Sequence, residues 1–348
     1  MAARAFITGL SGLTLSDAER GFVQAALPWG LILFKRNIDT PAQVTELIRS
    51  FRDAVGTEAP VLVDQEGGRV QRLGPPHWPA YPPGAAYAAL FAADPQVGCE
   101  AARIGSRLIA ADLHPLGITV DCLPLADVPV SGADAVIGDR AYGTTPRQVA
   151  TIAAAVAEGL MQGGVLPVLK HIPGHGRATA DSHRDLPRVD TDRATLEATD
   201  FAAFAPLAAI PLGMTAHVVY TAIDPACPAT TSRLMIDEVI RGVIGFRGAL
   251  MGDDVSMGAL SGTIAARTRA SLTAGCDLVL HCNGRMDEME AVAAETPELS
   301  GAALARTDAA LAARRVPDGA DIAALRQRFA ALLATFAPNG GTDPTVAS

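Results

Sequence analysis

Polar residues gather at four places in the sequence, and most of these groups follow a short apolar run. They lie at residues 64–72, at 170–183, at Asp253 and Asp254, and at 136–142. Carboxylates, imidazoles and basic side chains of these kinds can attack a carbon atom, carry protons or hold hydroxyl groups. The residue types and their spacing therefore indicate a functional site assembled from distant parts of the chain.

The first group reads DQEGGRVQR and follows the apolar run Val61-Leu62-Val63. Its double glycine allows the backbone to turn tightly beneath a ligand. The carboxylate of Asp64 could accept hydrogen bonds from two sugar hydroxyl groups, and Arg72 could donate hydrogen bonds in return. The group predicts a sugar-binding turn, although an exposed ion pair would give the same local pattern.

The second group contains KHIPGHG at residues 170–176 and DSH at residues 181–183. Lys170 and His171 end an apolar run and would place adjacent donors at one edge of a sheet. Asp181 lies two residues before His183, so its carboxylate could orient the imidazole and favour the protonated form. The segment 172–192 is long for a loop, which indicates function. A surface histidine is the ordinary alternative for any single His.

The third group is the pair Asp253 and Asp254, which follows the strand-like run Ala249-Leu250-Met251. Side chains alternate along a strand, so we expect one carboxylate to face the site and the other to turn into the surrounding structure. Two carboxylates that only cap a helix are the alternative. In the fourth group, Arg140 could reach an anionic or carbonyl oxygen of a ligand.

Together these groups offer an anionic nucleophile, a separate proton donor and several groups that bind hydroxyls. A retaining glycosidase needs this set, with the nucleophile and the acid/base about 5 to 5.5 Å apart across the scissile bond.

The elements that must position these groups alternate between short apolar runs and longer helical stretches, as in repeated βα units. Eight candidate strands predict an α/β fold, a single-domain (β/α)8 TIM-like barrel, whose functional groups follow the strands. We expect this domain to span residues 1–337 and the tail 338–348 to be disordered. The candidate strands are Ala5–Thr8, Leu31–Phe34, Val61–Asp64, Ile118–Cys122, Val168–His171, Leu212–His217, Ala249–Gly252 and Asp277–His281. The candidate helices include Pro41–Val55, Pro146–Gln162, Arg193–Ala205, Ser232–Arg241 and Thr263–Ala274.

Composition excludes several classes of function. The chain is 49% apolar, carries a net charge of −9, and has no run of Lys or Arg, so we expect no nucleic-acid partner. Its apolar stretches are interrupted, which predicts no membrane partner. Five cysteines without a CxxC pair and an N-terminus without an export segment favour the cytoplasm. We expect a small-molecule substrate and a monomer or weak homo-oligomer.

The six landmarks GLILFKRN, VDQEGGRVQR, AVIGDRAY, KHIPGHG, DSH and DDVSM, in this order, resemble the NagZ-type β-N-acetylglucosaminidases of glycoside hydrolase family 3. The resemblance implies that Asp253 attacks the anomeric carbon and that His183, oriented by Asp181, is the acid/base. It also implies that Asp64, Arg72, Arg140, Lys170 and His171 bind N-acetylglucosamine, without cofactor or metal. The implied substrates are N-acetylglucosaminyl-1,6-anhydro-N-acetylmuramyl peptides of cytoplasmic peptidoglycan recycling.

Four places depart from the usual pattern of this family: Asp139, Ile172, Gly252 and the run 121–124. Three other functions stay open. A metal-dependent hydrolase could use His171, His175 and His183 with an Asp as ligands. A phosphorylase is compatible with a histidine acid/base, which tolerates a phosphate acceptor better than a carboxylate would. A non-catalytic sugar-binding protein would keep Asp64 and Arg72 alone.

Overall fold

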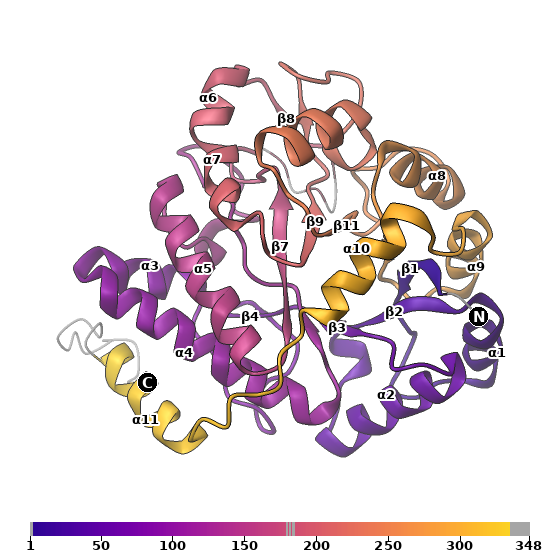
Figure 1. The fold of residues 1–348 in the computed structure, drawn as a ribbon, viewed down its shortest axis with the longest axis horizontal. Coiled ribbons are helices and arrows are strands. Elements are labelled where there is room, and N and C mark those ends of the chain that lie inside the picture. The colour runs from indigo at the N-terminus through magenta and orange to yellow at the C-terminus, as the bar shows by residue number, and fades with distance from the viewer. Residues whose placement is uncertain (1–2, 179, 181, 183–184, 335–348) are drawn as a thin grey trace, which may run out of the picture.

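Eight parallel strands form one sheet in the order β11-β9-β7-β6-β3-β2-β1-β12, and helices surround it (Figure 1). The structure is a computed structural model that describes residues 3–178, 180, 182 and 185–334. A bridge between Met251 and Leu278 joins the two edge strands, so the sheet curls into a barrel. The predicted α/β barrel is confirmed. Asp181, His183 and the tail 338–348 lie outside the described residues.

All eight predicted strands are present, with shifted ends. They are β1 (Arg4–Thr8), β2 (Pro28–Leu33), β3 (Val61–Val63), β6 (Val120–Asp121), β7 (Leu166–Ile172), β9 (Leu212–Thr215), β11 (Ala249–Met251) and β12 (Val279–His281). β6 is shorter than predicted, yet the chain after it still runs beside β7. The amides of Val168 and Lys170 donate to Leu123 and Pro124, and the amide of Ala126 donates to Lys170. This continuation carries the chain to the carboxyl end of the barrel.

The barrel interior is filled by apolar side chains, one or more from every strand. The cluster includes Ile7, Ile32, Leu62, Val120, Val168, Leu212, Met251 and Leu280. A larger cluster lies between the outer faces of the strands and the helices. Burial on both faces explains why the strands appear in the sequence as continuous apolar runs.

The helices are α1 (Asp17–Ala26), α2 (Pro41–Val55), α3 (Gly84–Ala93), α4 (Pro95–Leu113), α5 (Pro146–Gln162), α6 (Arg193–Ala198), α7 (Asp200–Phe204), η6 (Met235–Val243), α8 (Ile264–Ala274), α9 (Met286–Glu295), α10 (Gly301–Ala312) and α11 (Ile322–Ala334). Two predicted helices, α2 and α5, have the predicted bounds. Each begins after a threonine, Thr40 or Thr145, whose hydroxyl accepts a backbone N–H of the first turn. Within the described parts of the chain, no helix combines the length and the apolar character that crossing a bilayer requires.

Two predicted helices differ from the structure. The segment Arg193–Ala205 breaks into α6 and α7 at Thr199, where Arg177 binds the Thr199 hydroxyl and the Asp200 carboxylate. The segment Ser232–Arg241 is largely a π-helix, η6, and the Ser232 hydroxyl accepts the amide of its first residue, Met235. The contact with Arg177 at the first break comes from outside the helical segment, whereas the Ser232 contact is a local cap.

A short hairpin of β4 (Gln65–Gly67) and β5 (Val70–Gln71) follows β3 and was not predicted as strands. Its turn requires the double glycine, because Gly67 and Gly68 have φ values of 95° and 56°. A Cβ atom on Gly67 would lie 2.3 Å from the carbonyl oxygen of Pro82. The predicted tight turn is therefore confirmed, and it presents Asp64 and Glu66 on the same side of the barrel.

Candidate active site

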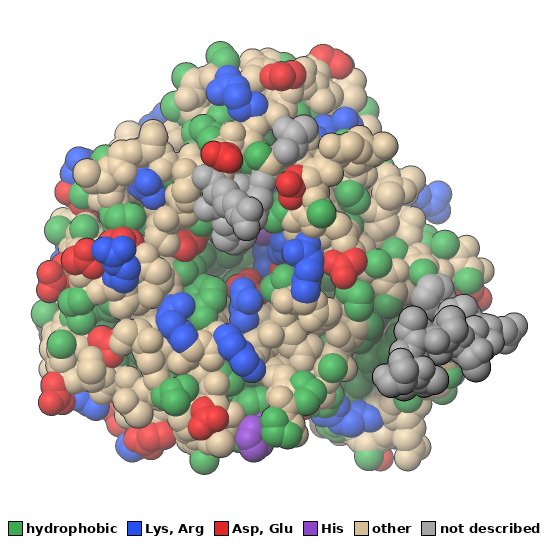
Figure 2. Space-filling view, turned by 180° about the vertical axis from the view of Figure 1, so that it is seen from behind, with side chains coloured by type: hydrophobic (Ala, Val, Ile, Leu, Met, Phe, Trp, Pro, Cys, Tyr) green, Lys and Arg blue, Asp and Glu red, His purple; other side chains and the backbone are tan. Residues whose placement is uncertain are grey.

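A cavity of about 690 Å³ opens at the carboxyl ends of the strands. Figure 2 shows Lys and Arg side chains gathered around a hollow near the centre of this face, with Asp and Glu side chains at its border. Six of the predicted site residues line the cavity: Asp64, Arg72, Arg140, Lys170, His171 and Asp253. The structure thus brings together residues that follow β3, β5 and β11, two residues of β7, and Arg140 of the 136–142 segment. The remaining two, Asp181 and His183, lie outside the described residues.

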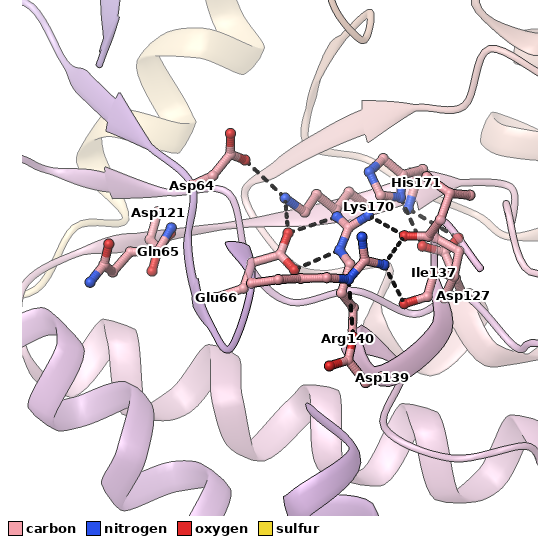
Figure 3. Close-up of polar contacts among 12 residues, drawn as sticks. Asp64, Gln65, Glu66, Asp121, Asp127, Ile137, Asp139, Arg140, Lys170 and His171 are labelled. Carbon is pink, nitrogen blue, oxygen red and sulfur yellow. Dashed lines mark hydrogen bonds and ion pairs between the residues drawn. The ribbon is translucent and has the colours of Figure 1, made fainter. Parts of the chain in front are cut away.

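A chain of alternating charges crosses one wall of the cavity, and Figure 3 shows the part of it from Asp64 to Arg140. The Lys170 ammonium lies 3.0 Å from Asp64 Oδ1 and 2.7 Å from Glu66 Oε1. Arg72 donates to Asp64 Oδ2 at 3.0 Å, and Arg140 donates to both oxygens of Glu66 at 2.8 Å. The order is Arg72, Asp64, Lys170, Glu66, Arg140. We call these five residues the charge chain.

Burial and opposite charges act against each other in the charge chain. Burial alone would raise the pKa of Asp64, but Lys170 and Arg72 lower it well below its ordinary value. Burial likewise opposes ionisation of Glu66, yet Arg140 and Lys170 lower its pKa to about 2. The same carboxylates raise the pKa of Lys170 in spite of burial. Buried ion pairs contribute little net stability because desolvation offsets their attraction. Because the ion pairs of the charge chain add little stability and lie beside a cavity, we infer that they serve to bind a ligand.

His171 is held in one orientation by Asp127, which the sequence analysis did not select. The ring nitrogen Nδ1 of His171 lies 2.8 Å from Asp127 Oδ2, and because a carboxylate only accepts, Nδ1 carries the hydrogen. The other oxygen of Asp127 accepts the amide of His175 at 2.6 Å. Asp127 lies just after the segment that continues β6 beside β7. Its position, a polar residue directly after the apolar run 122–126, is the feature of the sequence that could have identified it as a site residue.

Asp253 and Asp254 both line the cavity, directly after β11. The carboxylate of Asp254 is engaged by its own surroundings, since it accepts the amide and hydroxyl of Ser256 and the amide of Cys282. Asp253 Oδ1 accepts the amide of Asp254 at 2.8 Å. The expectation that one carboxylate turns into the surrounding structure fits Asp254 by its hydrogen bonds, although its side chain still borders the cavity.

His217, which the sequence analysis also did not select, contacts the loop that contains Asp253 and Asp254. It is fully buried, and its Nε2 donates to the backbone carbonyl of Asp254 at 3.0 Å. Its Nδ1 therefore accepts the hydroxyl hydrogen of Thr230 at 2.7 Å. The methyl group of Thr230 also explains the glycine at 252, because a Cβ there would lie 2.9 Å from it.

His175 and Ser182 connect the segment after β7 to the barrel. His175 Nε2 lies 3.0 Å from the Ser182 hydroxyl, and the amide of Ala259 donates to the Ser182 carbonyl at 3.2 Å. The metal alternative placed His171 and His175 together as ligands. Among the described residues, no cluster of three His, Cys, Asp or Glu side chains has a geometry for a metal ion. His183 lies outside that set.

Replacing His175 with glutamine should make the protein less sensitive to acid. Burial, reinforced by His171, lowers the pKa of His175 to about 4. Between pH 6.5 and 4 the unfolded chain therefore binds a proton that the folded protein does not, and stability is lost as the pH falls through this window. From pH 7 to pH 5 the free energy of unfolding of the wild type should fall by about 2 kcal/mol more than that of the variant. Urea unfolding at both pH values measures this difference, and equal losses would contradict it.

The barrel and its charged cavity fit a glycoside hydrolase, and the comparisons with known proteins identify this enzyme class and the family. Residues 10–316 match the Glycosyl hydrolase family 3 N terminal domain. The chain belongs to glycosyl hydrolase family 3.

Two relatives named beta-hexosaminidase are similar over most of their length. The one from Xanthomonas axonopodis pv. citri is 36% identical over 304 residues, 86% of this chain and 89% of the relative. The one from Alkalilimnicola ehrlichii is 40% identical over 281 residues, 79% of each chain. Among solved structures, NagZ from Neisseria gonorrhoeae in complex with zinc ion superposes with a TM-score of 0.82 at 29% identity, covering 96% of this chain and 97% of NagZ. The predicted resemblance to NagZ-type enzymes is confirmed.

Proposed function

We propose that the protein is a retaining exo-β-N-acetylglucosaminidase in which Asp253 is the nucleophile. The single observation that carries the proposal is that Asp253 lines the same cavity as Asp64, Arg72 and Lys170. A carboxylate and a set of hydroxyl-binding charges thus meet at one pocket, although they come from different strands. The names of the similar proteins support N-acetylglucosamine as the bound sugar.

In the proposed first step, a carboxylate oxygen of Asp253 forms a bond to the anomeric carbon while the bond to the leaving oxygen breaks. His183, oriented by Asp181, gives its proton to that oxygen. In the second step a water molecule gives a proton to His183, and its oxygen displaces Asp253 from the sugar. The products are N-acetylglucosamine and the shortened glycan, and the enzyme is regenerated. The roles of Asp181 and His183 come from the sequence, since both lie outside the described residues.

The charge chain and His171 would hold the sugar. Two of the three ammonium hydrogens of Lys170 face Asp64 and Glu66, which leaves one for a hydroxyl group. Asp64 accepts from Lys170 and Arg72 and retains lone pairs for sugar hydroxyls. Because Asp127 holds the Nδ1 side of His171, only the Nε2 side of that ring is open to a ligand.

The proposed natural substrates are N-acetylglucosaminyl-1,6-anhydro-N-acetylmuramyl peptides, and the proposed setting is peptidoglycan recycling in the cytoplasm. The resemblance to NagZ-type enzymes supports both. We propose that the reaction needs no cofactor and no metal, and that the protein acts as a monomer or weak homo-oligomer.

The purified protein should hydrolyse 4-nitrophenyl N-acetyl-β-glucosaminide at a rate unaffected by phosphate or by a chelator. Proton NMR should show the β anomer of N-acetylglucosamine forming first, because two displacements at one carbon retain configuration. The β-glucoside with the same leaving group is the matched control and should react much more slowly.

Each alternative has its own outcome in this assay. Release of a sugar phosphate in phosphate buffer would favour a phosphorylase. Activity lost to a chelator and restored by zinc would favour a metal-dependent hydrolase. Binding of N-acetylglucosamine without release of nitrophenol would indicate a sugar-binding protein. Initial formation of the α anomer would contradict the nucleophilic role of Asp253.

A further inference from the structure

Glu66 is the anion between Lys170 and Arg140 in the charge chain, yet it is not among the residues that line the cavity. Its side chain is 4% exposed and lies behind Arg140 and Lys170, which are among the described residues that border the cavity. Figure 3 shows its carboxylate between these two cations. A ligand in the cavity would therefore meet Arg140 and Lys170, while Glu66 would act on the ligand only through them.

Glu66 determines which hydrogens of Arg140 can reach a ligand. Its two oxygens accept from Nε and Nη2 of Arg140, both at 2.8 Å. The carbonyl oxygen of Val136 accepts from Nη1 at 3.1 Å. Five N–H groups fan out from a guanidinium in one plane, so these three bonds fix that plane and leave one hydrogen each on Nη1 and Nη2.

Glu66 also fixes the position of the Lys170 ammonium. Lys170 is 1% exposed and its flexible side chain would otherwise sample several rotamers. Glu66 at 2.7 Å and Asp64 at 3.0 Å hold the nitrogen between them. Without Glu66, no carboxylate would lie between the buried cations Lys170 and Arg140, and Lys170 would be left with Asp64, which Arg72 also uses. Repulsion would then move Lys170, Arg140 or both.

From this geometry we infer that Glu66 is a positioning residue, which orients Arg140 and Lys170 so that both can bind the sugar. The inference rests on the proposed function, since it assigns a task within the same site. It concerns sugar binding and not proton transfer, so the effect of removing Glu66 is independent of the leaving group.

The test compares Glu66→Gln and Glu66→Asp with a matched control, Asp277→Asn. Asp277 is also a buried carboxylate between two cations, Arg241 and Arg306, but it lies before β12 at the opposite end of the barrel. These three variants and the wild type are assayed with aryl N-acetyl-β-glucosaminides of good and poor leaving groups. The inhibition constant of N-acetylglucosamine and the melting temperature are measured in parallel.

Glu66→Gln should lower kcat/KM by on the order of 100-fold, as expected when one partner of a buried charge pair is removed. The loss should be the same for good and poor leaving groups, and inhibition by N-acetylglucosamine should weaken by a similar factor. Glu66→Asp keeps the charge and should recover part of the activity. Asp277→Asn should lower the melting temperature but keep kcat/KM per folded molecule.

Two results would overturn the inference while the wild type remains active. One is a Glu66→Gln protein with a lower melting temperature but with kcat/KM and the inhibition constant of N-acetylglucosamine unchanged. That result would make Glu66 purely structural. The other is a loss that grows with the pKa of the leaving group, which would place Glu66 in proton transfer. A wild type that does not cleave the glycosides would instead refute the proposed function.

Discussion

Replacing Asp253 with alanine should lower the rate of glycoside cleavage by at least about 10⁴-fold, because a retaining reaction cannot form its covalent intermediate without a nucleophile. The melting temperature should change little, since Asp253 borders an open cavity. Steady-state assays with 4-nitrophenyl N-acetyl-β-glucosaminide and thermal unfolding of the same samples measure both quantities.

Asp254→Asn is the matched control for this prediction. Asp254 accepts two hydrogen bonds from Ser256 in its own loop and one from Cys282 after β12, so its replacement should disturb the position of that loop and cause a smaller loss. Sodium azide adds a second control, because the anion fits where the carboxylate was and should restore turnover of Asp253→Ala but not of Asp254→Asn. The reverse pattern, an active Asp253→Ala with an inactive Asp254→Asn, would exchange the two roles.

Replacing His183 with alanine should slow cleavage by about 10²- to 10⁴-fold for substrates with poor leaving groups, which need a proton as the bond breaks. Aryl glycosides with very acidic phenols need no proton, so their first step should be nearly unchanged. Rates measured across a series of phenols should therefore depend steeply on the phenol pKa in the variant and weakly in the wild type.

Glu66→Gln separates this effect from a general loss of sugar binding, because its losses should not depend on the phenol. Equal losses for all phenols in His183→Ala would count against an acid/base role for His183. In that case another proton donor near the cavity would be needed, and His171 and His175 both border it.

The sequence predicted the barrel well because its strands are buried on both faces. Runs such as Val61-Leu62-Val63 must be apolar throughout, and this makes them visible without knowledge of their neighbours. Helix starts were equally clear where Thr40 and Thr145 precede a proline, because the cap and the fixed φ of proline act locally. The break at Thr199 was missed, because it depends on Arg177.

The distinction between features set by local sequence and features set by distant residues also holds for the site. Residues that follow a strand, such as Asp64, Lys170 and Asp253, could be selected because all strands of the barrel end at one face. Glu66, Asp127 and His217 could not be assigned tasks, because each acts through a partner far along the chain. The partners are Arg140, His171 and the carbonyl of Asp254.

The charge chain also determines which groups can contribute to a pH optimum. Its carboxylates have pKa values pushed below their ordinary range, to about 2 for Glu66, while Lys170 and Arg140 are pushed upward. Their ionisation is thus constant from mildly acidic to alkaline solution. A bell-shaped dependence of turnover should therefore come from groups outside the charge chain, so a pH profile of turnover should report on proton transfer without a contribution from these sugar-binding charges.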